Sequence, residues 1–228
     1  MRLIFSALLA AAVLVTVSPL VSARHQNHGR AHPREISLFN GRDLTGWTYY
    51  LEDPHAKMAD VWSVDPAQRI IICQGHPLGY IRTVNDYTNY VLRLEWRFNP
   101  ITKKAGNSGV LLQVVGPDKV WPRCIEAQLQ SGEAGDFWLV DGAQLDTPPD
   151  RIDPGTPRHR LRTRTNEKPI GEWNQYEITV DRGHITLKVN GEVLNEGKNA
   201  EEIPGKIALQ SEGAEIHFRN IYLTPIEH

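Results

Sequence analysis

The chain has 228 residues and a formal net charge of −2, from 25 lysines and arginines against 27 aspartates and glutamates. This charge balance gives no indication of a nucleic-acid partner. The two cysteines, Cys73 and Cys124, could pair in an exported protein, but the sequence does not show whether they lie close together.

The first 23 residues have the pattern of a signal peptide. Met1-Arg2 is a short basic start, residues 3–17 are almost wholly apolar, and Val21-Ser22-Ala23 resembles a signal-peptidase site. The apolar run is shorter than the ~20 residues that span a membrane. We therefore expect the segment to be cleaved and the mature protein to have no membrane span. The alternative is an uncleaved membrane anchor. Residues 24–35 are expected to form a flexible lead-in. The predicted location is periplasmic or extracellular.

Residues 36–228 are predicted to form one all-β domain. About 190 residues suffice for one sizeable core, and no convincing amphipathic helix longer than ten residues is found. Many short alternating segments separated by Gly and Asn turns predict an all-β sandwich of antiparallel sheets. The expected strands lie within residues 36–47, 61–64, 69–73, 80–82, 90–98, 110–115, 121–130, 137–140, 143–145, 173–181, 184–189, 193–194, 205–210 and 214–223.

Two segments between these strands are of interest. Residues 137–140 and 143–145 are expected to form a hairpin around the Asp141-Gly142 turn. Residues 146–169 form the one long irregular segment, and it is rich in proline and then in arginine. Such a segment could be a lid over a binding face or a plain surface insertion, and the sequence favours neither. Nearby acids offset its arginines.

The strand predicted over residues 121–130 has two different faces. Its apolar side chains and its more polar side chains alternate with a period of two, which is typical of a half-buried strand. The apolar face consists of Ile125, Ala127 and Leu129, and the other face consists of Cys124, Glu126, Gln128 and Gln130. The polar row could bind sugar hydroxyls, or it could be an ordinary solvated surface.

A curved sheet leaves a concave face on which polar side chains can bind a sugar. Arg, Glu and Gln suit this role because they offer paired hydrogen-bond donors and acceptors. The predicted wall consists of Arg93, Glu95, Arg97, Glu126, Gln128, Gln130, Gln210 and Glu212, with Trp138, Trp121 and Tyr80 as aromatic platforms. The group Arg93, Glu95 and Arg97 could instead be a cross-strand ion-pair ladder.

The Glu126 strand does not carry a carboxylate pair for ordinary glycoside hydrolysis. Retaining enzymes need two carboxylates about 5 Å apart, and the next residues on this face are the amides Gln128 and Gln130. Phosphate loops, nucleophile elbows and zinc-protease motifs are also missing from the sequence. The histidines show no metal-ligand spacing, so we expect them to be surface or packing residues.

An ordered series of short motifs runs along the chain. These motifs are Leu38-Phe-Asn-Gly-Arg-Asp-Leu-Thr-Gly-Trp47, Asn107-Ser-Gly109, Ile125-Glu-Ala-Gln128, Gly171-Glu-Trp-Asn174, Val189-Asn-Gly191, Gly205-Lys-Ile-Ala-Leu-Gln-Ser-Glu-Gly213 and Phe218-Arg-Asn-Ile221. Over residues 36–226 the chain resembles the 3-keto-disaccharide hydrolase family. The resemblance implies a concanavalin A-like jelly-roll sandwich, an exported bacterial protein that cleaves 3-keto-glycosides, and Glu126 facing the site.

Two departures from the family pattern concern the mechanism. Many members carry Asp shortly after the Gln where this chain has Ser131-Gly132-Glu133, and many carry Asp-His where it has Ser211-Glu212. No cofactor is predicted with certainty, and a divalent metal is left open.

A ketone at C3 of a sugar permits cleavage with a single base. The ketone acidifies the hydrogen at C2, so one base can remove it. The glycosidic oxygen at C1 is β to the carbonyl and can then leave by elimination. Water adds afterwards and completes the hydrolysis. We therefore expect Glu126 to be the base, with Arg93 or Arg97 stabilising the enolate. The alternatives are a non-catalytic carbohydrate-binding module or a structural domain of the cell envelope, since one fold serves all three.

Overall fold

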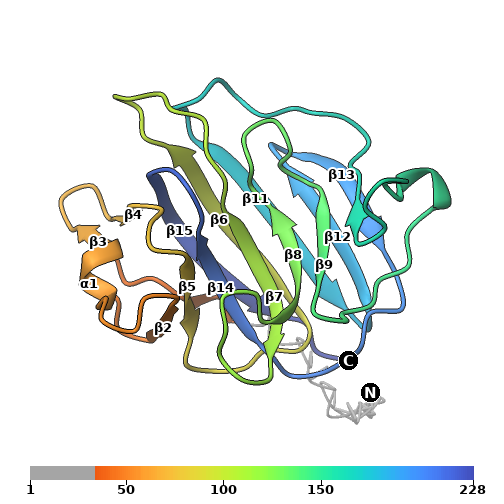
Figure 1. Ribbon diagram of the computed structural model, residues 1–228. Coiled ribbons are helices and arrows are strands. Elements are labelled where there is room, and N and C mark those ends of the chain that lie inside the picture. The colour runs from red at the N-terminus through yellow and green to blue at the C-terminus, as the bar shows by residue number, and fades with distance from the viewer. Residues whose placement is uncertain (1–33) are drawn as a thin grey trace, which may run out of the picture. The chain divides into compact units, whose positions relative to one another are not determined.

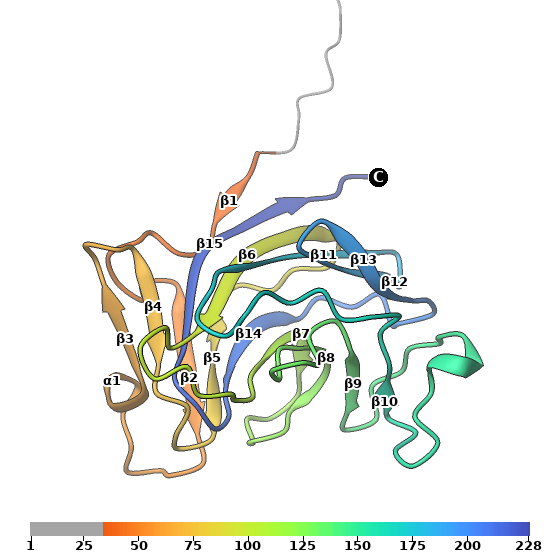
Figure 2. The ribbon, with the colours of Figure 1, turned by 90° about the horizontal axis from the view of Figure 1, so that it is seen from above.

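The computed structural model describes residues 34–228, which form two antiparallel sheets packed face to face (Figures 1 and 2). In spatial order, the larger sheet contains β13 (Glu192–Gly197), β12 (His184–Val189), β11 (Asn174–Asp181), β6 (Tyr90–Phe98), β15 (Ile216–Pro225), β4 (Ile70–Cys73) and β3 (Trp62–Asp65), with β1 (Ile36–Ser37) paired to β15. The smaller sheet contains β10 (His159–Arg160), β9 (Phe137–Val140), β8 (Arg123–Gln128), β7 (Gly109–Val115), β14 (Lys206–Ser211), β5 (Gly79–Thr83) and β2 (Trp47–Leu51). The predicted all-β sandwich is confirmed, while the predicted signal peptide and most of the lead-in lie outside the described residues.

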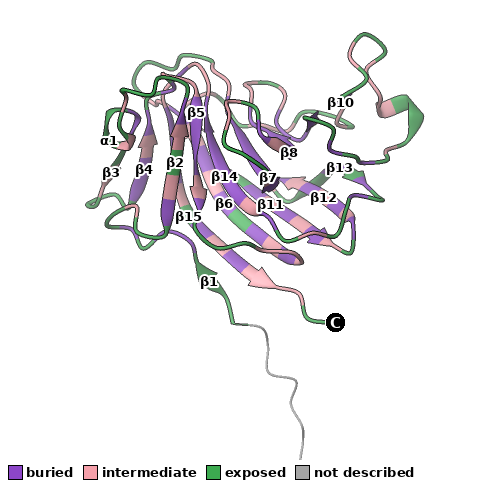
Figure 3. Ribbon diagram, turned by 60° about the horizontal axis from the view of Figure 1, so that its bottom comes forward, coloured by how far each residue is buried: buried purple, intermediate pink, exposed green. Residues whose placement is uncertain are grey.

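The main core lies between the two sheets, and both sheets contribute residues to it. Figure 3 shows buried residues along the strands of both sheets. In β6 the predicted alternation is confirmed, because Leu92, Leu94 and Trp96 are buried while Arg93 is exposed. The Trp96 ring packs on Tyr176 of β11 with 5.3 Å between ring centroids. From the other sheet, β8 contributes its predicted apolar face to the same core.

Helical structure is minor in the part of the chain that the structure describes. It consists of α1 (Met58–Val61) and the 3-10 turn η1 (Pro149–Arg151). No helix among these residues has the length and apolar character needed to cross a membrane.

The hairpin predicted around Asp141-Gly142 is wrong. The turn itself forms, with φ of 51° at Asp141 and 80° at Gly142, but residues 143–145 do not continue as a strand. The free edge of β9 pairs instead with β10, where Trp138 lies opposite His159. A distant segment thus occupies the edge that the expected hairpin partner would have taken.

The long segment of residues 146–169 is fixed to the sandwich at several points. The buried carboxylate of Asp136 accepts hydrogen bonds from the backbone N–H of Arg162 at 2.7 Å and from its guanidinium at 2.9 Å. The same carboxylate lies 2.7 Å from Nε2 of His159. Near the end of the segment, Glu167 accepts backbone hydrogen bonds from Gly132 and Ala134 at 3.2 and 2.9 Å. The segment is therefore an ordered extension of the sheet edge.

The two cysteines lie in different sheets. Cys73 is in β4 and Cys124 is in β8, and both are buried as free thiols. Burial raises the pKa of the Cys73 thiol to about 12, so this side chain is neutral at physiological pH.

We predict that Asp136→Ala loosens the long segment. The change leaves the partners Arg162 and His159 without their buried acceptor, which is expected to lower the free energy of unfolding by about 3–5 kcal/mol. Urea denaturation measures the loss, and limited proteolysis should show new cleavage within residues 146–169. Asp150→Ala removes an exposed carboxylate of the same segment and is expected to change stability by less than about 0.5 kcal/mol. Equal effects of the two changes would contradict the anchoring role.

Candidate active site

A pocket of about 450 Å³ opens on the outer face of the smaller sheet, the face turned away from the main core. Strand pairing explains its centre. Glu126 of β8 lies directly opposite Leu111 of β7 on one side and opposite Trp138 of β9 on the other. The pocket is lined by Asn107, Trp121, Glu126, Gln128, Gln130, Trp138, Val140, Asp141, Arg158 and Glu212.

The carboxyl group of Glu126 is buried in the floor of this pocket. Only 5% of the residue is exposed, and among the described residues its Oε1 has no hydrogen-bond partner. The reading of this strand face as a solvated surface is therefore wrong. Residue 109 is glycine, and this leaves space for the Glu126 side chain. A Cβ at residue 109 would lie 2.3 Å from Oε1 of Glu126. The turn before Gly109 is fixed by a 2.7 Å hydrogen bond from the Ser108 hydroxyl to the carbonyl of Gln210.

Burial raises the pKa of Glu126 to about 8, with a further increase from the nearby Glu212 carboxylate and a smaller opposing effect of Arg158. Removing a carboxylate from water disfavours its charged form, and a second negative charge adds to this effect. At neutral pH the Glu126 carboxyl group is therefore mostly protonated.

Glu212 supplies a second carboxylate that the β8 strand itself lacks. It directly follows β14 and bridges to Asn107 across the sheet. Burial raises the pKa of Glu212 to about 6, although its hydrogen bond with the Asn107 side chain favours the ionised form. Glu212 is less buried than Glu126, so at neutral pH it is mostly ionised.

Arg158 brings a positive charge from the long segment to the pocket. Its guanidinium carbon lies 5.0 Å from the centre of the Trp138 ring. The neighbouring His159 ring stacks on the same indole, with centroids 4.3 Å apart and planes 10° apart. Because His159 is also bound to Asp136, the anchoring of the long segment positions both the indole and the guanidinium.

The three predicted amides have different surroundings. Gln128 uses its Oε1 to accept backbone hydrogen bonds from Leu129 and Gln130, both at 2.8 Å, so it organises the end of β8. Gln130 lines the pocket beside it. Gln210 lies in β14 and is only 1% exposed, and neither polar atom of its side chain has a hydrogen-bond partner among the described residues.

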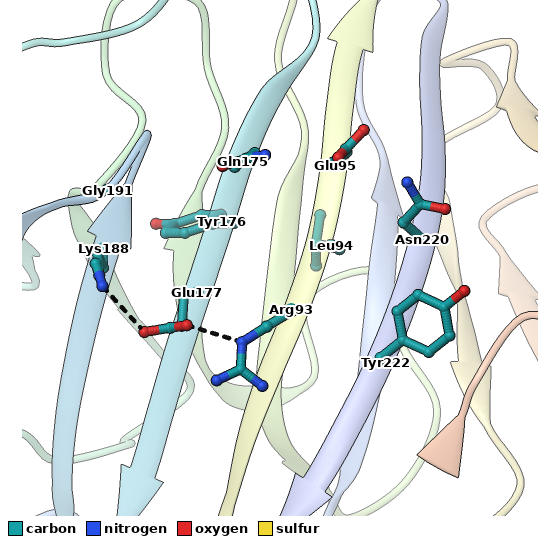
Figure 4. A pocket seen from close by; sticks show the side chains of 10 residues that line it. All are labelled: Arg93, Leu94, Glu95, Gln175, Tyr176, Glu177, Lys188, Gly191, Asn220 and Tyr222. Carbon is teal, nitrogen blue, oxygen red and sulfur yellow. Dashed lines mark hydrogen bonds and ion pairs between the residues drawn. The ribbon is translucent and has the colours of Figure 1, made fainter. Parts of the chain in front are cut away.

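Four predicted wall residues do not line this pocket, namely Gln210 and the three residues of β6. Arg93, Glu95 and Arg97 lie in β6, which pairs with β11 and β15 of the larger sheet. Their side chains face outward there, and Arg93 and Glu95 line a separate cavity of about 380 Å³ (Figure 4). The prediction that they share a wall with Glu126 is therefore wrong, and so is the expected role of Arg93 or Arg97 beside it.

The ion-pair alternative is correct for Arg93 and Glu95. Arg97 instead lies over the Trp173 ring, with 4.4 Å between its guanidinium carbon and the ring centroid. Arg93 donates to Glu177 at 2.8 Å, and Lys188 lies 3.4 Å from the same carboxylate. Glu95 accepts a 2.6 Å hydrogen bond from Arg219. Alternation identified the outward face of β6, but it carries no information on which sheet contains the strand.

The aromatic platforms expected from the sequence are only partly available. Trp121 is 42% exposed and lines the pocket together with Trp138. Tyr80 is fully buried, and its hydroxyl group donates to Asp118 at 2.9 Å, so it offers no ring to a sugar.

Sequence reasoning missed three polar residues of the pocket, Asn107, Asp141 and Arg158. Asp141 was identified only as a turn residue. Asn107 begins a turn that belongs to the ordered motif series, which could have identified it. Arg158 lies in irregular chain without periodicity, and no local signal distinguishes it from its neighbouring arginines.

One group of residues between 34 and 228 has metal-ligand geometry. Ligand atoms of Glu133, Asp136 and His159 lie within 4.8 Å of one another. However, both Asp136 oxygens already accept hydrogen bonds, and the Arg162 guanidinium at 2.9 Å supplies the compensating positive charge. These contacts fit a structural ion-pair network better than a divalent metal site.

Comparisons with known proteins agree with this architecture. A family model described as 3-keto-alpha-glucoside-1,2-lyase-like domain matches residues 34–224, which confirms the resemblance drawn from the motifs. No curated protein matched the chain.

Several solved structures share the fold. A proposed glycosyl hydrolase from Parabacteroides distasonis is 23% identical with a TM-score of 0.61, covering 85% of this chain and 94% of that one. The Bacillus licheniformis β-glucanase is 12% identical with a TM-score of 0.57, covering 87% and 100%. Carbohydrate-binding module CBM66 from Bacillus subtilis is 9% identical with a TM-score of 0.52, covering 78% and 94%. The predicted fold class, shared with this glucanase, is confirmed, and the fold occurs both in an enzyme and in a carbohydrate-binding module.

We predict that Gly109→Ala displaces the Glu126 side chain from its position. The added methyl group would overlap Oε1 and Cγ of Glu126, so the carboxyl group must move out of the floor. Any reaction that uses the Glu126 carboxyl group is expected to slow at least about tenfold, because a displaced group loses its effective concentration. Gly155→Ala is the control, since its Cβ would meet its nearest neighbour at 3.4 Å. Unchanged activity of Gly109→Ala would contradict the assigned position.

The raised pKa of Glu126 predicts a pH-dependent stability. The usual pKa of a glutamate is 4.5, and in the folded protein the pKa of Glu126 is about 8. Between these two pH values the folded protein keeps a proton on Glu126 that the unfolded chain has lost. The free energy of unfolding should therefore fall as pH rises through this range, by at most about 1.4 kcal/mol per pH unit. Glu126→Gln is expected to remove this contribution and to be more stable than the wild type at pH 8. Urea denaturation at several pH values tests this, with Glu177→Gln expected to keep the wild-type slope.

Proposed function

Because the chain belongs to the 3-keto-alpha-glucoside-1,2-lyase-like domain family, we propose that it cleaves 3-keto-glycosides, including disaccharides, by elimination and hydration. The observation that carries the proposal is the pair of carboxyl groups in one pocket, Glu126 and Glu212, with unequal burial and unequal pKa. Neighbouring titratable groups whose environments separate their pKa values are typical of acid–base catalysis.

The chemistry of a 3-keto sugar suits this pair. Removal of the C2 proton gives an enolate, and the glycosidic oxygen at C1 is then expelled to leave a C1=C2 double bond conjugated with the ketone. Water adds to C1, and a proton returns to C2. The pocket supplies groups for proton transfer in both halves, and Arg158 supplies positive charge near the developing anion.

Two other functions remain as alternatives. A carboxyl pair also serves ordinary glycoside hydrolysis, and Glu212 provides the second group that was missing from β8. A non-catalytic carbohydrate-binding module would use the same fold. A buried carboxyl group with a raised pKa supports catalysis over binding, since binding a neutral sugar does not require one.

We also propose that the protein acts outside the cytoplasm, in the periplasm or the extracellular space. The basic start, apolar run and small residues of the first 23 positions support this proposal. Its partner there would be an oxidised glycoside or oligosaccharide.

The function is tested with a 3-keto-disaccharide and its unoxidised parent. The purified protein is expected to release monosaccharide from the 3-keto compound and not from the parent, as measured by chromatography. A double variant, Glu126→Ala with Glu212→Ala, controls for contaminating enzymes and should release nothing. Release from both compounds would indicate an ordinary glycosidase. Release from neither would reject the enzymatic function and favour a binding module.

A further inference from the structure

We propose that Glu126 acts as a neutral hydrogen-bond donor to the C3 carbonyl oxygen of the substrate, and that Glu212 is the base that removes the C2 proton. This inference rests on the proposed function and reverses the role that the sequence predicted for Glu126. It follows from the different surroundings of the two carboxyl groups.

The surroundings of Glu126 favour the uncharged acid. Its cross-strand neighbours are Leu111 and Trp138, so a carbon-rich side chain lies on each side within the sheet. Its Oε1 is buried and has no hydrogen-bond partner among residues 34–228. An ionised carboxylate in such a place would lose much of its hydration, and Arg158 would compensate for only part of that loss. A protonated carboxyl group can instead donate its hydrogen to a substrate oxygen.

The charged neighbours of Glu126 support the same assignment. Glu212 opposes ionisation of Glu126, and Arg158 favours it to a lesser degree. Two further titratable groups interact with Glu126, the thiol of Cys124 and the phenol of Tyr176, and burial raises the pKa of each well above its usual value. Neither provides positive charge that would stabilise a Glu126 anion.

The surroundings of Glu212 suit a base. It is partly exposed at the edge of the pocket, where water can solvate its charge. The Asn107 side chain forms a hydrogen bond that favours the ionised form of Glu212 and orients it. A base must be ionised before substrate binds, and Glu212 meets this condition at neutral pH whereas Glu126 does not.

The reaction can then proceed without any further reactant except water. Glu212 takes the C2 proton, and the electron pair of the broken C–H bond forms the enolate, whose oxygen accepts the hydrogen bond from Glu126. As the C1–O bond breaks, the departing alkoxide receives the proton held by Glu212. In the second half Glu212 takes a proton from the water that adds to C1, and this proton finally goes to C2. Glu126 keeps its own proton throughout.

This division of roles gives opposite expectations for two glutamine variants. In Glu126→Gln the amide N–H still donates to the carbonyl oxygen, so kcat/KM at pH 7 should fall only about tenfold. In Glu212→Gln no base remains, and kcat/KM should fall by about 10²–10⁴-fold. Glu177→Gln, on the outer face of the other sheet, is the matched control and should behave as the wild type.

The pH profile adds a measurement that a structural role would not change. For the wild type, kcat/KM should rise with ionisation of Glu212 near pH 6 and fall with ionisation of Glu126 near pH 8. Glu126→Gln should lose the falling limb and keep the rising one. Severe loss in Glu126→Gln together with mild loss in Glu212→Gln would overturn the assignment.

Infrared difference spectroscopy of the free protein separates this inference from the proposed function. At pH 7 the wild type minus Glu126→Gln spectrum should contain the C=O band of a protonated carboxylic acid. Lack of that band overturns the inference even if 3-keto-glycosides are cleaved. If the band is present but the wild type cleaves no 3-keto-glycoside, the proposed function fails, and with it the catalytic roles.

Discussion

The burial of one carboxyl group constrains the whole candidate site. Glu126 lies in the middle of a sheet face between a leucine and a tryptophan, a position that would ordinarily hold an apolar side chain. Its free energy there depends strongly on whether it carries a proton. The neighbouring backbone accommodates it through Gly109, and the nearby positive charge of Arg158 reduces the penalty for ionisation. The face thus combines apolar side chains with a carboxyl group whose charge depends on its surroundings.

The long segment after β9 connects this chemistry to the stability of the fold. Asp136 binds Arg162 and His159, His159 stacks on Trp138, and Trp138 faces Arg158. The buried ion pairs therefore fix the aromatic wall of the pocket as well as the edge of the sheet. A pocket built in this way is largely formed before substrate arrives, which reduces the entropy lost on binding.

Much of the fold could be predicted from the sequence, because alternation with period two records which side of each strand is buried. The inward faces of β6 and β8 were identified in this way, and so was the outward position of Glu126 and Gln128. Alternation does not record which strands are neighbours. Arg93 and Glu126 share the same pattern although their strands lie in different sheets. The proximity of Glu212 to Glu126 depends on β14 pairing with β7 across about a hundred residues of chain, and Arg158 lies where no periodic pattern exists.

The strand order also has a consequence for how the chain is made. The last two strands are internal to their sheets, since β14 lies between β7 and β5 and β15 lies between β6 and β4. Neither sheet can be completed until almost the entire polypeptide has left the ribosome. Long-range strand pairings of this kind also form slowly. A nascent chain of this topology therefore stays incompletely folded during translation. If the protein is exported as proposed, this delay would keep the chain unfolded, as passage through a secretion channel requires.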